Sequence, residues 1–143
     1  MKKFFAIAAL LVATLSVSAQ DYNWAVGLRG GLFNGITAKK IINNNAIEAG
    51  VALYSRAVSI DAVYEWQQPV IGEGFHLYYG AGAYTNISNH YFGLGAEGVV
   101  GLEYRIPINF PLAVSLDYRP AINLIGGVHP VFVNFGFGVK YCF

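Results

Sequence analysis

The segment from Val131 to Phe143 alternates between large apolar residues and residues that are mostly small or polar. The apolar set consists of Val131, Val133, Phe135, Phe137, Val139, Tyr141 and Phe143. A period of two places alternate side chains on opposite faces of a β-strand. The segment is therefore predicted to be a strand with one continuous apolar face.

Seven more segments show the same alternation, separated by residues typical of turns. Strands are predicted at residues 22–33, 36–42, 46–55, 57–67, 75–85, 91–106, 112–124 and 131–143. Asn34-Gly35 and the run 43–45 are predicted hairpin turns, and the polar run 86–90 is a predicted linker. Eight strands of about 10 residues leave about five or six residues for each connection. The pattern predicts an all-β fold, an eight-stranded antiparallel up-and-down β-barrel.

The first residues have the features of a Sec signal peptide. Two lysines precede the apolar run Phe4–Leu15, and small residues at positions 17–19 offer a cleavage site. We therefore expect export through the Sec route, with residues 1–19 removed and residues 20–143 forming the barrel domain.

Composition favours a protein that crosses a membrane. Charged residues make up 12% of the chain and apolar residues 55%, whereas soluble domains have about twice that charged share. No apolar run long enough for a spanning helix follows the signal peptide. A closed β-barrel also satisfies every backbone polar group in lipid. Without Lys2 and Lys3 the net charge is about −1, and no basic patch indicates nucleic-acid binding.

The less apolar face of the predicted strands is rich in glycine. It carries Gly27, Gly50, Gly80, Gly82, Gly93, Gly95, Gly101, Gly136 and Gly138. Small residues suit the interior of an eight-stranded barrel, which is barely wide enough for side chains. We therefore expect this face inside the barrel, the apolar face toward lipid, and no open pore.

The charged residues of that face are balanced in sign. They are Arg29, Glu48, Asp61, Glu65, Glu97, Glu103, Arg105, Asp117, Arg119 and Lys140. An unpaired charge away from water is costly, so these residues are expected to pair in a lumenal charge network. Lys39 and Lys40 are expected at a solvated loop end or strand rim. The single cysteine, Cys142, is expected on the inner face of the last strand, with a disulfide between molecules as the alternative.

Large aromatic residues gather at one predicted end of the barrel. If the first strand starts at the periplasmic side, Trp24, Tyr64, Trp66 and Tyr104 lie near the periplasmic rim, together with Tyr141 and Phe143. Membrane barrels place such an aromatic girdle at the membrane interface.

The signal peptide, the eight strands and the ending Phe137, Val139, Tyr141, Phe143 resemble small outer-membrane barrels of the OmpA/OmpX type. The runs GLEYRIP and FPLAVSLDYRP also resemble outer-membrane β-barrel proteins of Bacteroidetes-like bacteria. The resemblance implies an integral protein of a Gram-negative outer membrane, surrounded by outer-membrane lipid. It also implies that barrel-assembly machinery reads those four residues as an assembly signal, with periplasmic chaperones acting earlier. We expect a monomer with a structural or surface-recognition role, no enzymatic activity and no cofactor.

Two other functions stay open. Small outer-membrane barrels include lipid A acylases and deacylases, which combine His, Ser and an acidic residue. Ser88 and His90 share one predicted outer loop, although no acidic partner is near them in sequence. The second is a soluble exported barrel, similar to lipocalins, that holds an apolar ligand inside.

Two further motifs carry little chemistry. Residues 93–98 match G-x-G-x-x-G, but they lie inside a predicted strand, whereas a dinucleotide site needs this turn between a strand and a helix. His76, His90 and His129 lack the close spacing of metal ligands. No metal site is expected.

Overall fold

The computed structural model of the chain describes residues 23–54, 56–69, 74–106, 111–126 and 129–143. The regular structure in these ranges is β-strand. No helix within them is long and apolar enough to cross a membrane. The expected signal peptide, residues 1–19, lies outside the described residues.

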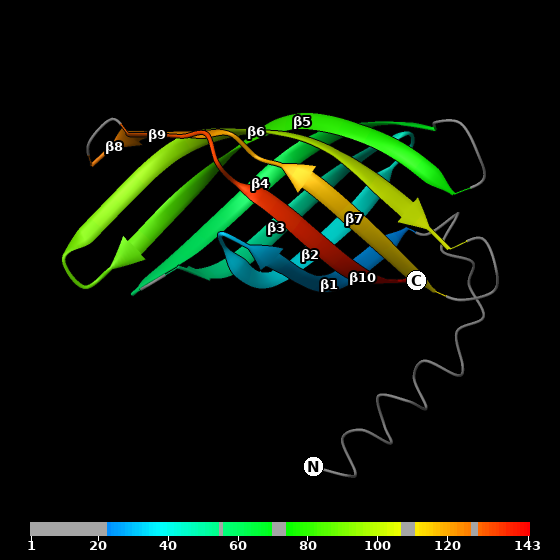
Figure 1. The fold of residues 1–143 in the computed structure, drawn as a ribbon, viewed down its shortest axis with the longest axis horizontal. Helices are drawn as coiled ribbons and strands as arrows, with labels where there is room; N and C mark the ends of the chain where they lie inside the picture. Colours follow the sequence, from blue (N-terminus) through cyan, green and yellow to red (C-terminus); the bar gives the residue numbers. More distant parts are fainter. Residues whose placement is uncertain (1–22, 55, 70–73, 107–110, 127–128) are drawn as a thin grey trace, which may run out of the picture.

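Ten strand segments form one antiparallel sheet that closes on itself (Figure 1). They are β1 (Trp24–Gly31), β2 (Asn34–Ile42), β3 (Asn45–Tyr54), β4 (Ala57–Pro69), β5 (Phe75–Ser88), β6 (Tyr91–Arg105), β7 (Leu112–Tyr118), β8 (Ala121–Ile125), β9 (His129–Val131) and β10 (Phe135–Cys142). Closure comes from β10, which pairs with both β1 and β7. Because β7 and β8 follow each other along one edge of β6, and β9 continues into β10, the ten segments make eight barrel strands. The predicted eight-stranded antiparallel barrel is confirmed.

The strands place apolar side chains outside and charged side chains inside. Leu28, Ile36 and Leu116 are 60–66% exposed on the outer face. The largest fully buried side chains of the described residues are instead Tyr78, Lys39, Glu48, Glu65, Glu103, Val63 and Cys142. This distribution is the reverse of the one in water-soluble domains, where Lys and Glu are almost never fully buried.

The first hairpin turn differs from the prediction. Asn34 and Gly35 belong to β2, and Gly35 pairs with Arg29. The chain turns before Asn34, at Leu32 and Phe33. Gly31 adopts a φ of 146° there, and its N–H donates to Asn34 Oδ1 at 3.0 Å. The predicted turn at 43–45 is confirmed in part: Asn43, with a φ of 57°, and Asn44 connect the paired residues Ile42 and Asn45.

The predicted linker at 86–90 is mostly strand. Residues 86–88 extend β5, and Ser88 pairs with Tyr91 across a two-residue turn. β5 and β6 therefore have 14 and 15 residues, against 8 and 9 for β1 and β2. The β5–β6 turn lies at the barrel end opposite the C terminus (Figure 1). We call these two ends the hairpin end and the terminal end.

The last two barrel strands are interrupted side by side. Pro120 has no N–H for the sheet, and the Arg119 N–H donates to the Asn134 carbonyl at 2.8 Å, which bridges the two breaks. Phe132 and Val133 are both exposed, so the alternation shifts by one residue there. The prediction of Val131 on the outer apolar face is therefore wrong: Val131 lines the interior.

Candidate functional site in the barrel interior

Lys39 is the centre of a charged cluster near the terminal end. Its Nζ lies 2.8 Å from Glu65, 3.1 Å from Glu103 and 3.6 Å from Glu48, and its side chain is fully buried. It also stands 4.5 Å from the centroid of the Tyr78 ring. The expectation that Lys39 lies at a solvated rim is wrong, because β2 turns Lys39 inward and leaves only Lys40 exposed. Three carboxylates explain how a lysine is held there.

Arg105 and Gln67 extend this cluster. Arg105 Nε donates to Glu103 Oε1 at 2.8 Å, and its Nη2 donates to Gln67 Oε1 at 2.5 Å. Gln67 in turn donates to Glu65 Oε2 at 3.2 Å. The cluster is therefore a connected network in which the Gln67 amide links the Glu65 carboxylate to the Arg105 guanidinium.

A second cluster, built around Arg119, lies nearer the hairpin end. Arg119 forms ion pairs with Glu48, with Asp61 at 3.2 Å and with Asp117 at 3.4 Å. Arg29 pairs with Asp117 at 2.7 Å. Glu48 joins the two clusters, since it also pairs with Lys140 at 2.8 Å and contacts Lys39.

Glu97 differs from the other predicted network residues. It points into the barrel from β6, but it forms no ion pair or hydrogen bond with any described residue, and its Oε1 is buried. The expectation that Glu97 joins the ion-pair network is wrong. The cations nearest to it in the cavity, Arg29 and Arg119, are already held by Asp117, Asp61 and Glu48.

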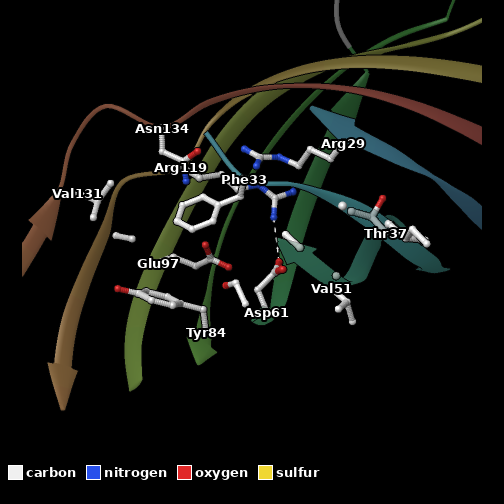
Figure 2. A pocket seen from close by; sticks show the side chains of 16 residues that line it. Arg29, Phe33, Thr37, Val51, Asp61, Tyr84, Glu97, Arg119, Val131 and Asn134 are labelled. Atoms are coloured by element: carbon white, nitrogen blue, oxygen red, sulfur yellow. Dashed lines mark hydrogen bonds and ion pairs between the residues drawn. The ribbon is translucent and has the colours of Figure 1, made fainter. Parts of the chain in front are cut away.

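Glu97 lines a cavity that is partly open to solvent, and the empty space there, including the open solvent, measures about 520 Å³. Figure 2 shows the side chains around it, with Glu97 between the rings of Phe33 and Tyr84 in that view. The polar lining residues include Arg29, Thr37, Ser59, Asp61, Arg119 and Asn134. The cavity lies toward the hairpin end. At this end β9 pairs only with β8 among the strands of the described chain.

Several interior residues were not among the predicted site residues. Lys39, Tyr78, Tyr84 and Asn134 all belong to the clusters or the cavity. Tyr78 and Tyr84 have the same parity in β5 as Gly80 and Gly82, which were placed inside. That parity was the signal available for the two tyrosines.

Aromatic contacts lie on the outer face near the terminal end, within β4 and between neighbouring strands. Tyr64 and Trp66 rings are 5.2 Å apart, and Trp66 stacks on Tyr79 at 5.8 Å. Tyr104 lies 4.6 Å from Phe75. Lys40 stands 5.1 Å from the Trp24 ring. The four predicted girdle residues are thus at one end, together with Tyr79 and Phe75, which were not predicted.

The C-terminal end of the chain pairs with β1 and so closes the barrel. Phe143 N–H donates to the Trp24 carbonyl at 2.8 Å, and Trp24 N–H donates to the Phe143 carbonyl at 2.9 Å. Phe137, Val139 and Phe143 are exposed on the outer face, and the rings of Tyr141 and Phe143 are 6.0 Å apart. Cys142 is fully buried on the inner side.

The residues considered for catalysis do not form a catalytic arrangement. Ser88 Oγ donates to the Tyr91 carbonyl at 3.5 Å within its hairpin. His90 is exposed, and no hydrogen bond or ion pair within the described chain joins it to Ser88 or to an acidic residue. The G-x-G-x-x-G match lies inside β6. Among the described residues, no group of three His, Cys, Asp or Glu side chains could hold a metal ion. The side chain of His129 lies outside what the structure describes.

Comparisons with protein-family models, with curated proteins and with solved structures found no match for this chain.

Proposed function

We propose that this chain is an integral outer-membrane barrel of the OmpA/OmpX type in a Gram-negative bacterium. It is monomeric, surrounded by outer-membrane lipid, and has a structural or surface-recognition role without enzymatic activity or an open pore. Barrel-assembly machinery and periplasmic chaperones act during its biogenesis, with Phe137, Val139, Tyr141 and Phe143 as the assembly signal.

The observation that carries this proposal is the inverted distribution of side chains. Leu28 and Leu53 are 66% exposed and Phe135 is 61% exposed, whereas Lys39 and Glu65 are fully buried. An outer surface of this kind is costly in water and suits hydrocarbon. A lipocalin-like carrier of apolar ligands requires the opposite arrangement, an apolar interior.

The interior packing supports the proposal that the barrel has no open pore. Lys39, Glu48, Glu65, Glu103 and Tyr78 are at most 1% exposed, and they fill the barrel near the terminal end. Such filling is expected for eight strands. An ion would have to break several buried ion pairs in order to pass.

A role in surface recognition is supported by the hairpin end. A membrane-spanning strand needs about 9–11 residues, whereas β5 and β6 have 14 and 15. At about 3.4 Å per residue, the β5–β6 hairpin is long enough to extend beyond the hydrocarbon layer. It presents exposed Ile87, Tyr91 and Phe92 near its turn.

Membrane fractionation tests the proposal. We expect the protein in the outer-membrane fraction, resistant to salt and carbonate and released only by detergent. Unboiled and boiled samples should also differ in mobility on a detergent gel, because a closed barrel resists detergent unfolding until it is heated. Release by carbonate would contradict the proposal and favour a soluble barrel. Loss of lipopolysaccharide modification in Ser88→Ala or His90→Ala would instead favour a lipid-modifying enzyme.

A further inference from the structure

The cavity at the hairpin end contains the one lumenal carboxylate without a counter-charge in the described chain. The other five lumenal acidic residues, Glu48, Asp61, Glu65, Glu103 and Asp117, each pair with a lysine or arginine nitrogen at 3.2 Å or less. Glu97 has no such partner, and its buried Oε1 accepts no hydrogen bond from any described residue. Glu97 is half-buried, and a carboxylate oxygen that is shielded from water without a partner is costly. A group that binds there and supplies a positive charge therefore gains a favourable interaction.

Among the described residues, every lumenal cation already forms an ion pair. Six acidic residues of the described lumen face five basic ones, Arg29, Lys39, Arg105, Arg119 and Lys140. Arg29 is held by Asp117, and Arg119 contacts three carboxylates. The described lumen therefore has one more acidic than basic residue, and Glu97 is the acidic residue without an ion pair.

Aromatic rings lie beside this carboxylate. Tyr84 pairs with Gly95 and Gly82 pairs with Glu97, so Tyr84 and Glu97 are diagonal neighbours on the inner face of β5 and β6. Gly95 leaves room for the Tyr84 ring, since a Cβ at residue 95 would lie 2.6 Å from the ring Cζ. Phe33 lines the same space from the β1–β2 turn (Figure 2). Carboxylates and aromatic rings are the groups that recognise organic cations.

The lining also provides further acceptors. Asn134 Oδ1 and Thr37 Oγ1 are buried and have no hydrogen-bond partner among the described residues. An ammonium group has three N–H donors, so a lining that offers a carboxylate and neutral oxygen acceptors suits it. A metal ion fits less well, because the described residues contain no group of three acidic, His or Cys ligands.

We propose that this cavity binds a small organic cation. Its primary ammonium group pairs with Glu97, and its short apolar or aromatic body packs against Tyr84 and Phe33. The cavity is partly open to solvent. The binding of the cation itself does not depend on the proposed function. Only the expectation that the cavity opens toward the cell exterior rests on it.

Benzylammonium is a suitable probe, with benzyl alcohol and benzoate as neutral and anionic analogues. The purified full chain in a non-ionic detergent is titrated with each compound by ligand-observed NMR. We expect saturable binding of benzylammonium, with the two analogues at least tenfold weaker. Glu97→Gln should weaken benzylammonium binding at least tenfold, and Glu97→Asp, which keeps the charge, should restore most of it.

Glu65→Gln is the matched control, because it neutralises a lumenal carboxylate that does not line the cavity. It should bind benzylammonium like the unchanged protein, and the gel shift on boiling reports whether each variant has folded. Equal binding by Glu97→Gln, equal binding of benzyl alcohol, preferential binding of benzoate, or no saturable binding by the folded protein would overturn the proposal. Carbonate release without detergent would contradict the membrane location alone, so the two failures are distinguishable.

Discussion

The Nζ of Lys39 lies 2.8 Å from the Glu65 carboxylate, and both side chains are fully buried inside the barrel. Lys40, the next residue, is exposed above the Trp24 ring on the outer face. Adjacent lysines on opposite faces of β2 thus occupy the charged interior and the aromatic rim. Substituting Lys39 or Lys40 therefore tests the charged interior and the outer rim separately.

Lys39→Met should destabilise the barrel strongly, because it leaves Glu48, Glu65 and Glu103 without their shared cation. Breaking a buried pair typically costs about 3–5 kcal/mol. Lys40→Met, the matched control, removes an exposed contact worth about 0.5–1 kcal/mol at most. Urea unfolding in lipid vesicles measures both. Equal losses of stability for the two variants would contradict the arrangement of the lumen.

Glu48→Gln should lower the free energy of unfolding, whereas Glu97→Gln should leave it unchanged or raise it slightly. Glu48 binds Lys39, Arg119 and Lys140, so its neutralisation should cost about 3–5 kcal/mol. Glu97 has no partner among the described residues, so its neutralisation removes an uncompensated charge and should be neutral or stabilising by about 1 kcal/mol. The comparison uses the same unfolding measurement. Strong destabilisation by Glu97→Gln would show that Glu97 has a partner in the folded protein.

Gly101→Ala should destabilise the barrel, because a Cβ there would lie 2.5 Å from the Tyr78 ring and 2.8 Å from the Cβ of Asp117. Tyr78 cannot easily move, since it is fully buried and donates to Asp117. Overpacking of this kind costs about 1–3 kcal/mol. Gly98→Ala is the control on the same strand, because the atom nearest to its added Cβ, the Gly80 carbonyl oxygen, would lie 3.7 Å away. A harmless Gly101→Ala would indicate a looser interior than the structure shows.

Cys142 should not react in the folded barrel. Its side chain is fully buried, and its Sγ lies 3.9 Å from the Lys140 carbonyl. A maleimide reagent should label the thiol only after boiling, and the protein should run as a monomer without reducing agent. Rapid labelling of the unheated protein, or a dimer that disappears on reduction, would favour the alternative of a disulfide between molecules.

Phe143 should contribute in two separable ways. Deleting it removes both backbone hydrogen bonds to Trp24, so the purified variant should refold less stably in detergent. Phe143→Ala keeps the backbone and should refold nearly normally, but as part of the proposed assembly signal it should reach lower folded levels in cells. Gel shift on boiling measures the folded fraction in both settings. Normal folded levels of Phe143→Ala in cells would count against the assembly signal.

The period-two pattern predicts the barrel well, because apolar and polar faces are separated along nearly every strand. Leu112, Val114 and Leu116 face outward and Ser115 and Asp117 face inward, as their alternation predicts. The prediction failed where the two faces of a strand do not differ in polarity. In β2, Ile41 and Lys39 share one face while Ala38 and Lys40 share the other, so polarity alone could not place Lys39 inside.

The cavity could not be predicted from sequence for a different reason. Its shape depends on the interruption at Phe132–Asn134, which shifts the alternation and turns Val131 inward. The alternation predicted an uninterrupted strand over residues 112–124, so the adjacent break at Pro120 was missed as well. The isolation of Glu97 depends on which carboxylates hold Arg29 and Arg119, and that pairing is decided by distances between strands far apart in sequence.

The position of the two tryptophans, Trp24 and Trp66, tests the central claim most directly. Both are 43% exposed on the outer face at the terminal end, and they are the only tryptophans in the chain. In vesicles of brominated lipid we expect strong fluorescence quenching by bromine near the headgroup end of the acyl chain, and weaker quenching by bromine near the bilayer centre. Absence of quenching by either lipid would contradict an apolar outer face in contact with the membrane.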